Sequence, residues 1–75
     1  MRTFEKLIDI LANYVEVDEI KSEDRFKSDL GMSSFDTMCL VGDIKSIFGV
    51  ELGASDFIKY KSVGEMAEHI AALTA

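Results

Sequence analysis

The sequence predicts an all-α bundle of four helices, with a long loop between the first two helices and a short third helix. Apolar residues recur at spacings of three and four in three separate segments, which is typical of amphipathic helices. Polar stretches and glycines separate these segments. Apolar residues make up 48% of the 75 residues, enough for one small core, and we expect a single domain over residues 1–75.

The first helix is predicted from about Thr3 to Val15. Its charged and amide side chains fall away from the apolar positions, so one face is expected to lie against the core. The apolar stripe comprises Phe4, Leu7, Ile8, Leu11 and Val15.

Residues 16–29 have the composition of a long loop, because they hold six acids and three bases and few apolar residues. We expect Ile20, Phe26 and Leu30 to attach this loop to the core. A calcium-binding loop is excluded, since the acids lack the alternating spacing and central glycine that such a loop requires. A connection of this length is uncommon in a small domain and often has a function.

The second helix is predicted over residues 34–48. Ser33 is a favourable N-cap residue, and Asp36, three residues later, completes a capping-box pattern with Asp in place of Glu. Gly31 permits a sharp turn ahead of the helix, because glycine adopts backbone angles that a side chain would forbid. Gly49 is well placed as the C-terminal cap.

One face of this second helix is predicted to be buried and the other to be exposed. The expected buried stripe comprises Phe35, Met38, Val41, Ile44 and Phe48, widened by Leu40 and Ile47. The expected outer face carries Asp36, Cys39, Asp43, Lys45 and Ser46.

Two further helices are predicted after a short connection over residues 50–54. Ser55 is expected to cap a brief helix that continues to Tyr60. Ser62 and Glu65 form a capping-box pattern that opens the last helix. The apolar stripe of that helix comprises Val63, Met66, Ala67, Ile70 and Leu73.

Residues 30–36, Leu-Gly-Met-Ser-Ser-Phe-Asp, resemble the modification site of the acyl carrier protein family, which shows Leu-Gly, one variable residue and Asp-Ser-Leu where its second helix starts. Ser33 stands where the family usually has Asp, and Phe35 where it has Leu. The helix order, the long first loop and residues 61–65 are also similar, so the resemblance extends over nearly the whole chain. It implies the acyl-carrier-protein fold, with a 4'-phosphopantetheine arm from coenzyme A attached covalently to Ser34.

This resemblance implies a carrier without catalysis of its own, which holds acyl, aminoacyl or polyketide intermediates as thioesters on the arm. The implied partners are a phosphopantetheinyl transferase and the enzymes that load and process the acyl group. Family members in fatty-acid synthesis have an acid-rich second helix, whereas this helix has only two acids, which suggests a specialised carrier. The residues expected to dock partners are Met32, Phe35, Asp36 and Asp43.

Composition and charge exclude several other classes of protein. The net charge of −6 argues against nucleic-acid binding, which relies on Lys and Arg contacts with phosphates. No apolar run approaches the ~18 residues of a membrane span, and we expect no signal peptide. Cys39 is the only cysteine, so no internal disulfide can form, which is consistent with the cytoplasm. A monomer is the default expectation.

Two alternatives to a carrier remain open. A protein interaction module with the same helical fold would dock partners without carrying the arm. A small enzyme would have Cys39 or His69 as its candidate reactive groups, although no orienting group follows at a useful spacing. The sequence contains no CxxC or HxxxH spacing, so a zinc site is not predicted. Met32 and Met38 flank Ser34, and we hypothesise that they line a pocket for an acyl chain.

Overall fold

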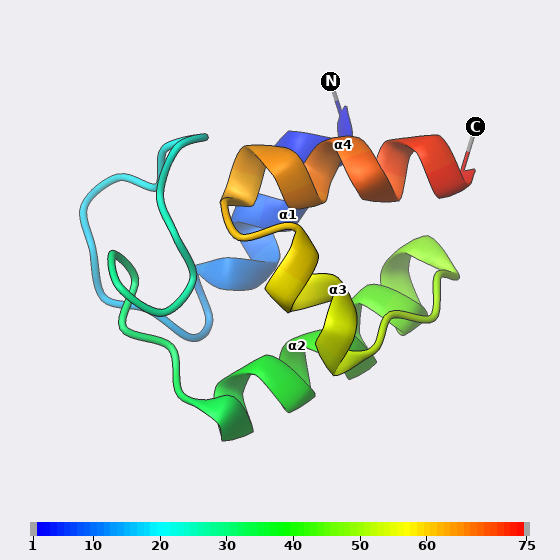
Figure 1. Ribbon diagram of the computed structural model, residues 1–75. Coiled ribbons are helices and arrows are strands. Elements are labelled where there is room, and N and C mark those ends of the chain that lie inside the picture. The colour runs from blue at the N-terminus through cyan, green and yellow to red at the C-terminus, as the bar shows by residue number, and fades with distance from the viewer. Residues whose placement is uncertain (1, 75) are drawn as a thin grey trace.

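The computed structural model describes residues 2–74 and shows four helices joined by loops (Figure 1). The helices are α1 (Arg2–Leu11), α2 (Ser34–Phe48), α3 (Ala54–Lys59) and α4 (Val63–Thr74). The predicted all-α fold, with a long loop between α1 and α2 and a short α3, is confirmed. Among the described residues, no helix is long and apolar enough to cross a membrane.

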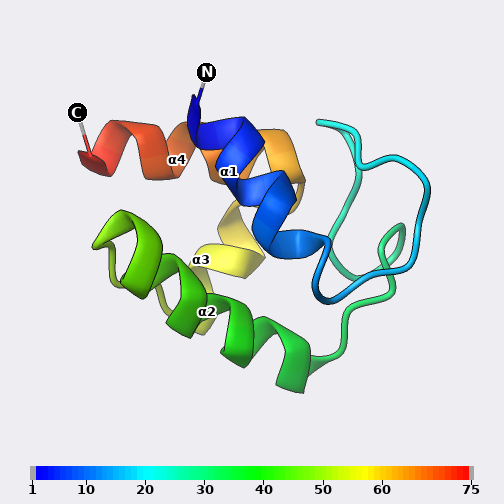
Figure 2. The same cartoon turned by 180° about the vertical axis from the view of Figure 1, so that it is seen from behind.

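The core lies where α1 meets α2 and α4. Figure 2 shows α1 in front, crossing between α4 above it and α2 below it. No polar or charged side chain of residues 3–74 is buried, so the core is stabilised by removing apolar surface from water. The buried side chains are Leu7, Ile10, Leu11, Phe26, Leu30, Met32, Leu40, Ile44, Val50, Leu52, Val63, Met66, Ala67 and Ile70.

The first helix is shorter than predicted. It ends at Leu11 instead of Val15, because the chain tightens into a turn in which the Tyr14 N–H donates to the Leu11 carbonyl at 2.8 Å. The buried face is also wider than the predicted stripe. Ile10 is buried whereas Ile8 is only half-buried, since α1 lies against both α2 and α4.

The second helix spans the predicted residues 34–48, but part of its predicted buried stripe is wrong. Leu40 and Ile44 are fully buried, whereas Phe35 and Met38 are 74% and 73% exposed. Ile47 is 52% exposed. Apolar residues occur on more than one side of this helix, so its own pattern does not select a face. Contact with α1 and the rest of the core selects the side of Leu40 and Ile44.

The predicted outer face of α2 is also partly wrong. Asp43 lies against the rest of the molecule, because its carboxylate accepts a hydrogen bond from the Tyr14 hydroxyl. Cys39 is half-buried. Lys45 is exposed as predicted and pairs with Glu51 at 2.8 Å. The Tyr14–Asp43 bond therefore connects the turn after α1 to the middle of α2.

The third helix begins at Ala54, so the predicted cap at Ser55 is wrong. Gly53 occupies the N-cap position, and the Asp56 carboxylate accepts its N–H at 2.8 Å. Ser55 therefore lies inside the helix. No residue of α3 is buried, which makes it the most superficially packed of the four helices.

The last helix begins with the predicted capping box. The Ser62 hydroxyl accepts the Glu65 N–H at 3.2 Å, and the Glu65 carboxylate accepts the Ser62 N–H at 3.3 Å. The predicted stripe is buried except for Leu73, which is 53% exposed because it lies in the last turn at the edge of the core.

Backbone hydrogen bonds attach the long loop over residues 12–33 to the start of α4. The Gly64 N–H donates to the Ser22 carbonyl at 2.8 Å, and the Val63 N–H donates to the Asp24 carbonyl at 2.9 Å. These N–H groups have no partner inside the helix, so the loop satisfies donors that would otherwise need water.

The same loop contributes side chains to the core. Phe26 and Leu30 are buried and Ile20 is half-buried against them, which confirms the predicted attachments. Phe26 also contacts Phe57 of α3 edge to face, with ring centroids 5.3 Å apart. The loop thereby holds α3 in place beside α2.

Candidate functional site

A capping box holds the first turn of α2. The Ser33 hydroxyl accepts the Asp36 N–H, and the Asp36 carboxylate accepts the Ser33 N–H, each at 3.1 Å. Gly31 has a φ of +69°, in the left-handed region that favours glycine. The predicted cap and turn are confirmed. The Ser33 hydroxyl is thus engaged in holding the helix start.

Ser34 is the first residue of α2, and its side chain is exposed. Among residues 2–74 its hydroxyl finds no hydrogen-bond partner, in contrast to that of Ser33. The first N–H groups of a helix have no acceptor inside it and give this end a partial positive charge. Such a helix start stabilises an attached phosphate.

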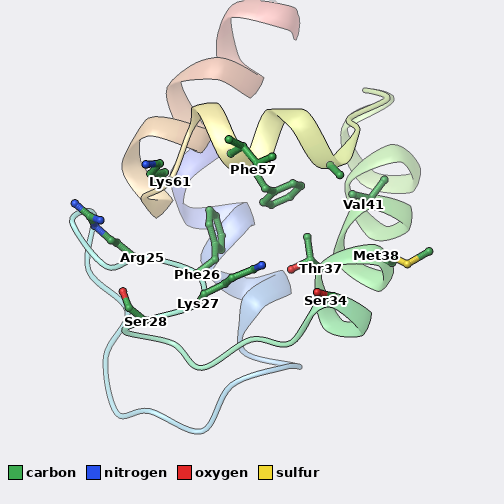
Figure 3. Close-up of a pocket in the computed structure, with 12 residues that line it drawn as sticks. Arg25, Phe26, Lys27, Ser28, Ser34, Thr37, Met38, Val41, Phe57 and Lys61 are labelled. Carbon is green, nitrogen blue, oxygen red and sulfur yellow. The ribbon is translucent and has the colours of Figure 1, made fainter.

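A pocket of about 560 Å³ opens beside Ser34 (Figure 3). It forms where the loop preceding α2, the first half of α2 and α3 meet. Its walls are mainly apolar, and hydroxyl and cationic groups complete the lining. The lining residues are Phe26, Met38, Val41, Ala54, Phe57 and Ile58, then Ser28, Ser34 and Thr37, then Arg25, Lys27 and Lys61.

The charges at this pocket are opposite in sign to the net charge of the chain. Three of the eight Lys and Arg residues line it, and no Asp or Glu is among the described lining residues, although the chain carries a net charge of −6. Figure 3 shows the Lys27 side chain extending across the pocket toward Ser34 and Thr37. Arg25 and Lys61 lie on the side of the pocket away from α2.

The four residues expected to dock partners lie in different environments. Phe35 is 74% exposed, directly after Ser34. Asp36 is half-buried in the capping box, and Asp43 is half-buried with Tyr14. Met32 is 4% exposed and belongs to the core, so its side chain is not on the surface. Met38 lines the pocket, whereas Met32 does not, which supports only half of the hypothesis that both line it.

The hydrogen bond between Tyr14 and Asp43 is the main electrostatic contact between α2 and the turn after α1. It raises the pKa of Tyr14 to about 12, first because the neutral hydroxyl donates this hydrogen bond to Asp43 and the phenolate cannot. Partial burial and the negative charge of Asp43 raise this pKa further, since both disfavour the phenolate.

Cys39 and His69, the candidate reactive groups, lie outside the lining of the pocket. His69 lies 3.4 Å from the Asp56 carboxylate and stacks on Tyr60, with ring centroids 4.1 Å apart. These contacts join α4 to α3, so His69 has a structural role here.

Most of the pocket was not predicted from the sequence. Ser34 and Met38 were singled out, whereas Lys27, Phe57 and Lys61 were not. These three residues come from the loop, α3 and the segment before α4. Lys61 belongs to the family-like run of residues 61–65, but no pattern in the sequence relates any of the three to Ser34. Only the tertiary arrangement brings them to Ser34.

Comparison with known proteins agrees with this geometry. The sequence profile of the family described as "Phosphopantetheine attachment site" matches residues 5–70. The acyl carrier protein of Clostridium acetobutylicum is 37% identical over 73 residues, which cover 95% of each chain. The chain therefore belongs to the acyl carrier protein family of phosphopantetheine-binding proteins. It carries a covalently attached 4'-phosphopantetheine group and has an acyl carrier role.

Proposed function

We propose that Ser34 bears the phosphopantetheine arm and that the protein presents acyl, aminoacyl or polyketide intermediates to partner enzymes as thioesters. The observation that carries this proposal is the exposed Ser34 hydroxyl, which lies beside the pocket and has no hydrogen-bond partner among the described residues. The adjacent Ser33 hydroxyl is already engaged as the helix cap. Of two neighbouring serines, only Ser34 therefore has its hydroxyl available.

The residues around Ser34 are suited to an attached phosphodiester. The helix start favours its negative charge, and Lys27 extends toward Ser34 across the pocket. The Thr37 hydroxyl already donates to the Ser33 carbonyl at 3.1 Å, so Lys27 is the side chain left to contact the phosphate. When bound, the arm supplies a flexible tether that ends in a thiol.

The attachment reaction needs only a nucleophilic hydroxyl from this chain. The Ser34 oxygen forms a bond to the phosphorus that bears pantetheine in coenzyme A. The pyrophosphate bond breaks at that phosphorus, and adenosine 3',5'-bisphosphate leaves with the electron pair. The Ser34 proton passes to a base of the transferase. The carrier itself contributes the exposed position and a rigid helix, which fix the geometry of attack.

Partner enzymes dock, in this proposal, on the exposed surface next to Ser34. Phe35 lies directly after the attachment residue, and Met38 is one turn further along α2. Large exposed apolar side chains at a functional site are typical of protein interfaces. Asp36 is placed to add a negative charge at the same end of α2, whereas Asp43 is held by Tyr14.

We also propose that the pocket shelters part of the acyl chain. Its apolar walls and its position beside Ser34 support this, and Met38 supplies one of the walls. Substituting Met38→Ala is expected to speed hydrolysis of a loaded acyl thioester, because the chain loses a contact surface. Unchanged hydrolysis rates, compared with those of the native carrier loaded with the same chain, would argue against sheltering by this wall.

The first experiment is measurement of intact mass after incubation with coenzyme A and a broad-specificity phosphopantetheinyl transferase. We expect one added phosphopantetheine on the native chain and on Ser33→Ala, and none on Ser34→Ala. A control carrier modified in parallel shows that the transferase is active. A folded native chain that gains no mass would contradict the proposal and favour an interaction module that docks through Phe35 and Met38.

With Cys39 as its only cysteine, the protein is expected to act in the cytoplasm.

A further inference from the structure

We propose that the pocket beside Ser34 selects acyl groups that end in a carboxylate, and that Arg25 and Lys61 hold this end. The inference rests on the proposed function and names the class of cargo. The apolar walls contact the hydrocarbon part of the chain. Arg25 and Lys61 lie on the far side of the pocket with their side chains directed outward, so a carboxylate would meet them at the outer rim.

The backbone itself holds Arg25 and Lys61 near each other. Arg25 pairs with Ser62 in an isolated antiparallel bridge, and the Phe26 N–H donates to the Lys61 carbonyl at 3.4 Å. Within residues 3–74, neither side chain forms an ion pair with an acid. A carboxylate at the end of the cargo would supply the opposite charge to both.

Two acidic residues lie near Arg25 and Lys61, but their carboxylates accept hydrogen bonds from backbone N–H groups. Asp29 accepts the Arg25 N–H at 2.8 Å, and Glu65 accepts the Lys61 N–H at 3.0 Å. Neither acid lines the pocket. They hold the backbone of the two basic residues in position and leave the guanidinium and ammonium groups available.

The order of groups along the pocket matches an apolar chain with a charged end. Figure 3 shows Ser34 on the α2 side, Phe26 and Phe57 in the middle, and Arg25 and Lys61 on the far side. A chain that extends from the Ser34 side therefore passes the two aromatic rings before it reaches the cations. A plain hydrocarbon end would instead leave apolar surface beside two hydrated charges, which gains nothing from them.

Because the net charge is −6, a preference for cargo that ends in a carboxylate would indicate local cations at the pocket. A protein with this net charge repels anions overall, so a preference for an anionic chain has to arise from local cations. This local attraction is sensitive to salt, because the Debye length falls from ~10 Å at 0.1 M to ~3 Å at 1 M ionic strength.

The test compares two cargoes that differ only at the far end. The transferase loads the chain with octanoyl or suberoyl phosphopantetheine from the corresponding coenzyme A thioesters, and intact mass confirms each product. The rate of thioester cleavage by hydroxylamine is then measured, because this uncharged nucleophile is not repelled by the suberoyl carboxylate. We expect the suberoyl thioester to react about fivefold more slowly, as a pair of partly solvated ion contacts would produce.

Matched variants assign the effect to the two cations. Arg25→Gln/Lys61→Gln removes two positive charges at the pocket, and Lys6→Gln/Lys45→Gln removes two exposed positive charges elsewhere. The first pair is expected to abolish the difference between the cargoes, and the second to keep it. Salt at 1 M should shrink the difference in the native chain. Backbone amide shifts at Arg25 and Lys61 should respond to suberoyl loading and not to octanoyl loading.

The outcomes separate this inference from the proposed function. If intact mass shows no loading at Ser34, the proposed function fails, and the inference fails with it. If both cargoes load and react at equal rates, the carrier role stands and the selection of carboxylates is overturned. Equal effects of the two double variants would also overturn it, because the preference would then follow net charge and not the pocket.

Discussion

At the scale of single residues, two adjacent serines have different roles. Ser33 caps α2 through its hydroxyl, whereas the Ser34 hydroxyl forms no hydrogen bond among the described residues. A cap residue stabilises its helix by satisfying a backbone donor. An exposed N1 serine contributes little to stability and is available for chemistry.

We predict unequal effects of alanine on stability at these two positions. Ser33→Ala should lower the free energy of unfolding by about 1 kcal/mol, because a capping hydrogen bond is lost. Ser34→Ala should change it by less than ~0.5 kcal/mol, as is usual for exposed positions. Urea denaturation of the unmodified proteins measures both. A larger loss from Ser34→Ala than from Ser33→Ala would contradict the assignment of cap and attachment residue.

Tyr14 provides a second test at the residue scale. Tyr14→Phe should destabilise the protein by about 1 kcal/mol, because it removes the hydrogen bond to the half-buried Asp43. Tyr60→Phe is the matched control, since the Tyr60 ring stacks on His69 and its hydroxyl has no hydrogen bond within residues 2–74. Chemical denaturation of the three proteins near pH 7 gives the comparison.

The Tyr14 bond also makes a signed prediction about pH. Its pKa is raised from 10.0 to about 12 in the folded state, so its contribution to stability is complete below pH 10. The contribution is lost as the pH rises from 10 to about 12, since the phenolate cannot donate to Asp43 and is repelled by it. The stability difference between native protein and Tyr14→Phe should therefore narrow over this range. A difference that stays constant would show that the bond is absent in solution.

At the scale of elements, the long loop approaches α4 closely at Gly64. A Cβ on Gly64 would overlap the Ser22 hydroxyl oxygen and lie 3.1 Å from the Ser22 carbonyl oxygen. The same carbonyl accepts the Gly64 N–H at 2.8 Å. The glycine therefore permits the close approach through which the loop satisfies the start of α4.

We predict that Gly64→Ala destabilises the protein by about 1 kcal/mol, because the Ser22 hydroxyl has to rotate away and the backbone at Ser22 has to shift slightly to admit the Cβ. Gly42→Ala is the matched control, since a Cβ there meets nothing within 4 Å and alanine is the better helix former. The control should stabilise by up to ~1 kcal/mol. Thermal unfolding distinguishes the two. A Gly64→Ala protein as stable as native would show that the loop does not dock on α4 as described.

At the scale of the whole molecule, the surface around Ser34 differs from the rest. The chain is acidic overall, yet basic and apolar side chains surround Ser34. Phe35, Met38 and Ile58 are each at least 70% exposed. A cluster of exposed apolar side chains is typical of a surface that contacts a partner.

Phe35 is the side chain that best separates docking from folding. Phe35→Ser should leave the free energy of unfolding nearly unchanged, since the ring is 74% exposed. It should lower kcat/KM of the transferase by about fivefold or more, as expected when an interface anchor is removed. Ile47→Ser, on the same helix and 52% exposed, is the control and should leave kcat/KM unchanged. Equal effects of both substitutions would argue against docking at Phe35.

The sequence by itself determined the local features of this protein. The caps at Ser33 and Ser62, the left-handed Gly49 with φ of +72°, and the bounds of α2 follow from patterns within a few residues. Hydrogen bonds between neighbours in the chain set these features, so neighbouring residues suffice to predict them. The family-like motif of residues 30–36 is local in the same way.

Only the tertiary structure decided which surfaces these elements share. α2 has apolar residues on more than one side, and contact with α1 buried Leu40 and Ile44 while leaving Phe35 exposed. The pocket combines the loop, α2, α3 and the segment before α4, which no local pattern relates to one another. The reason is physical. Hydrogen bonds within a helix depend on near neighbours, whereas burial depends on what another part of the chain brings into contact.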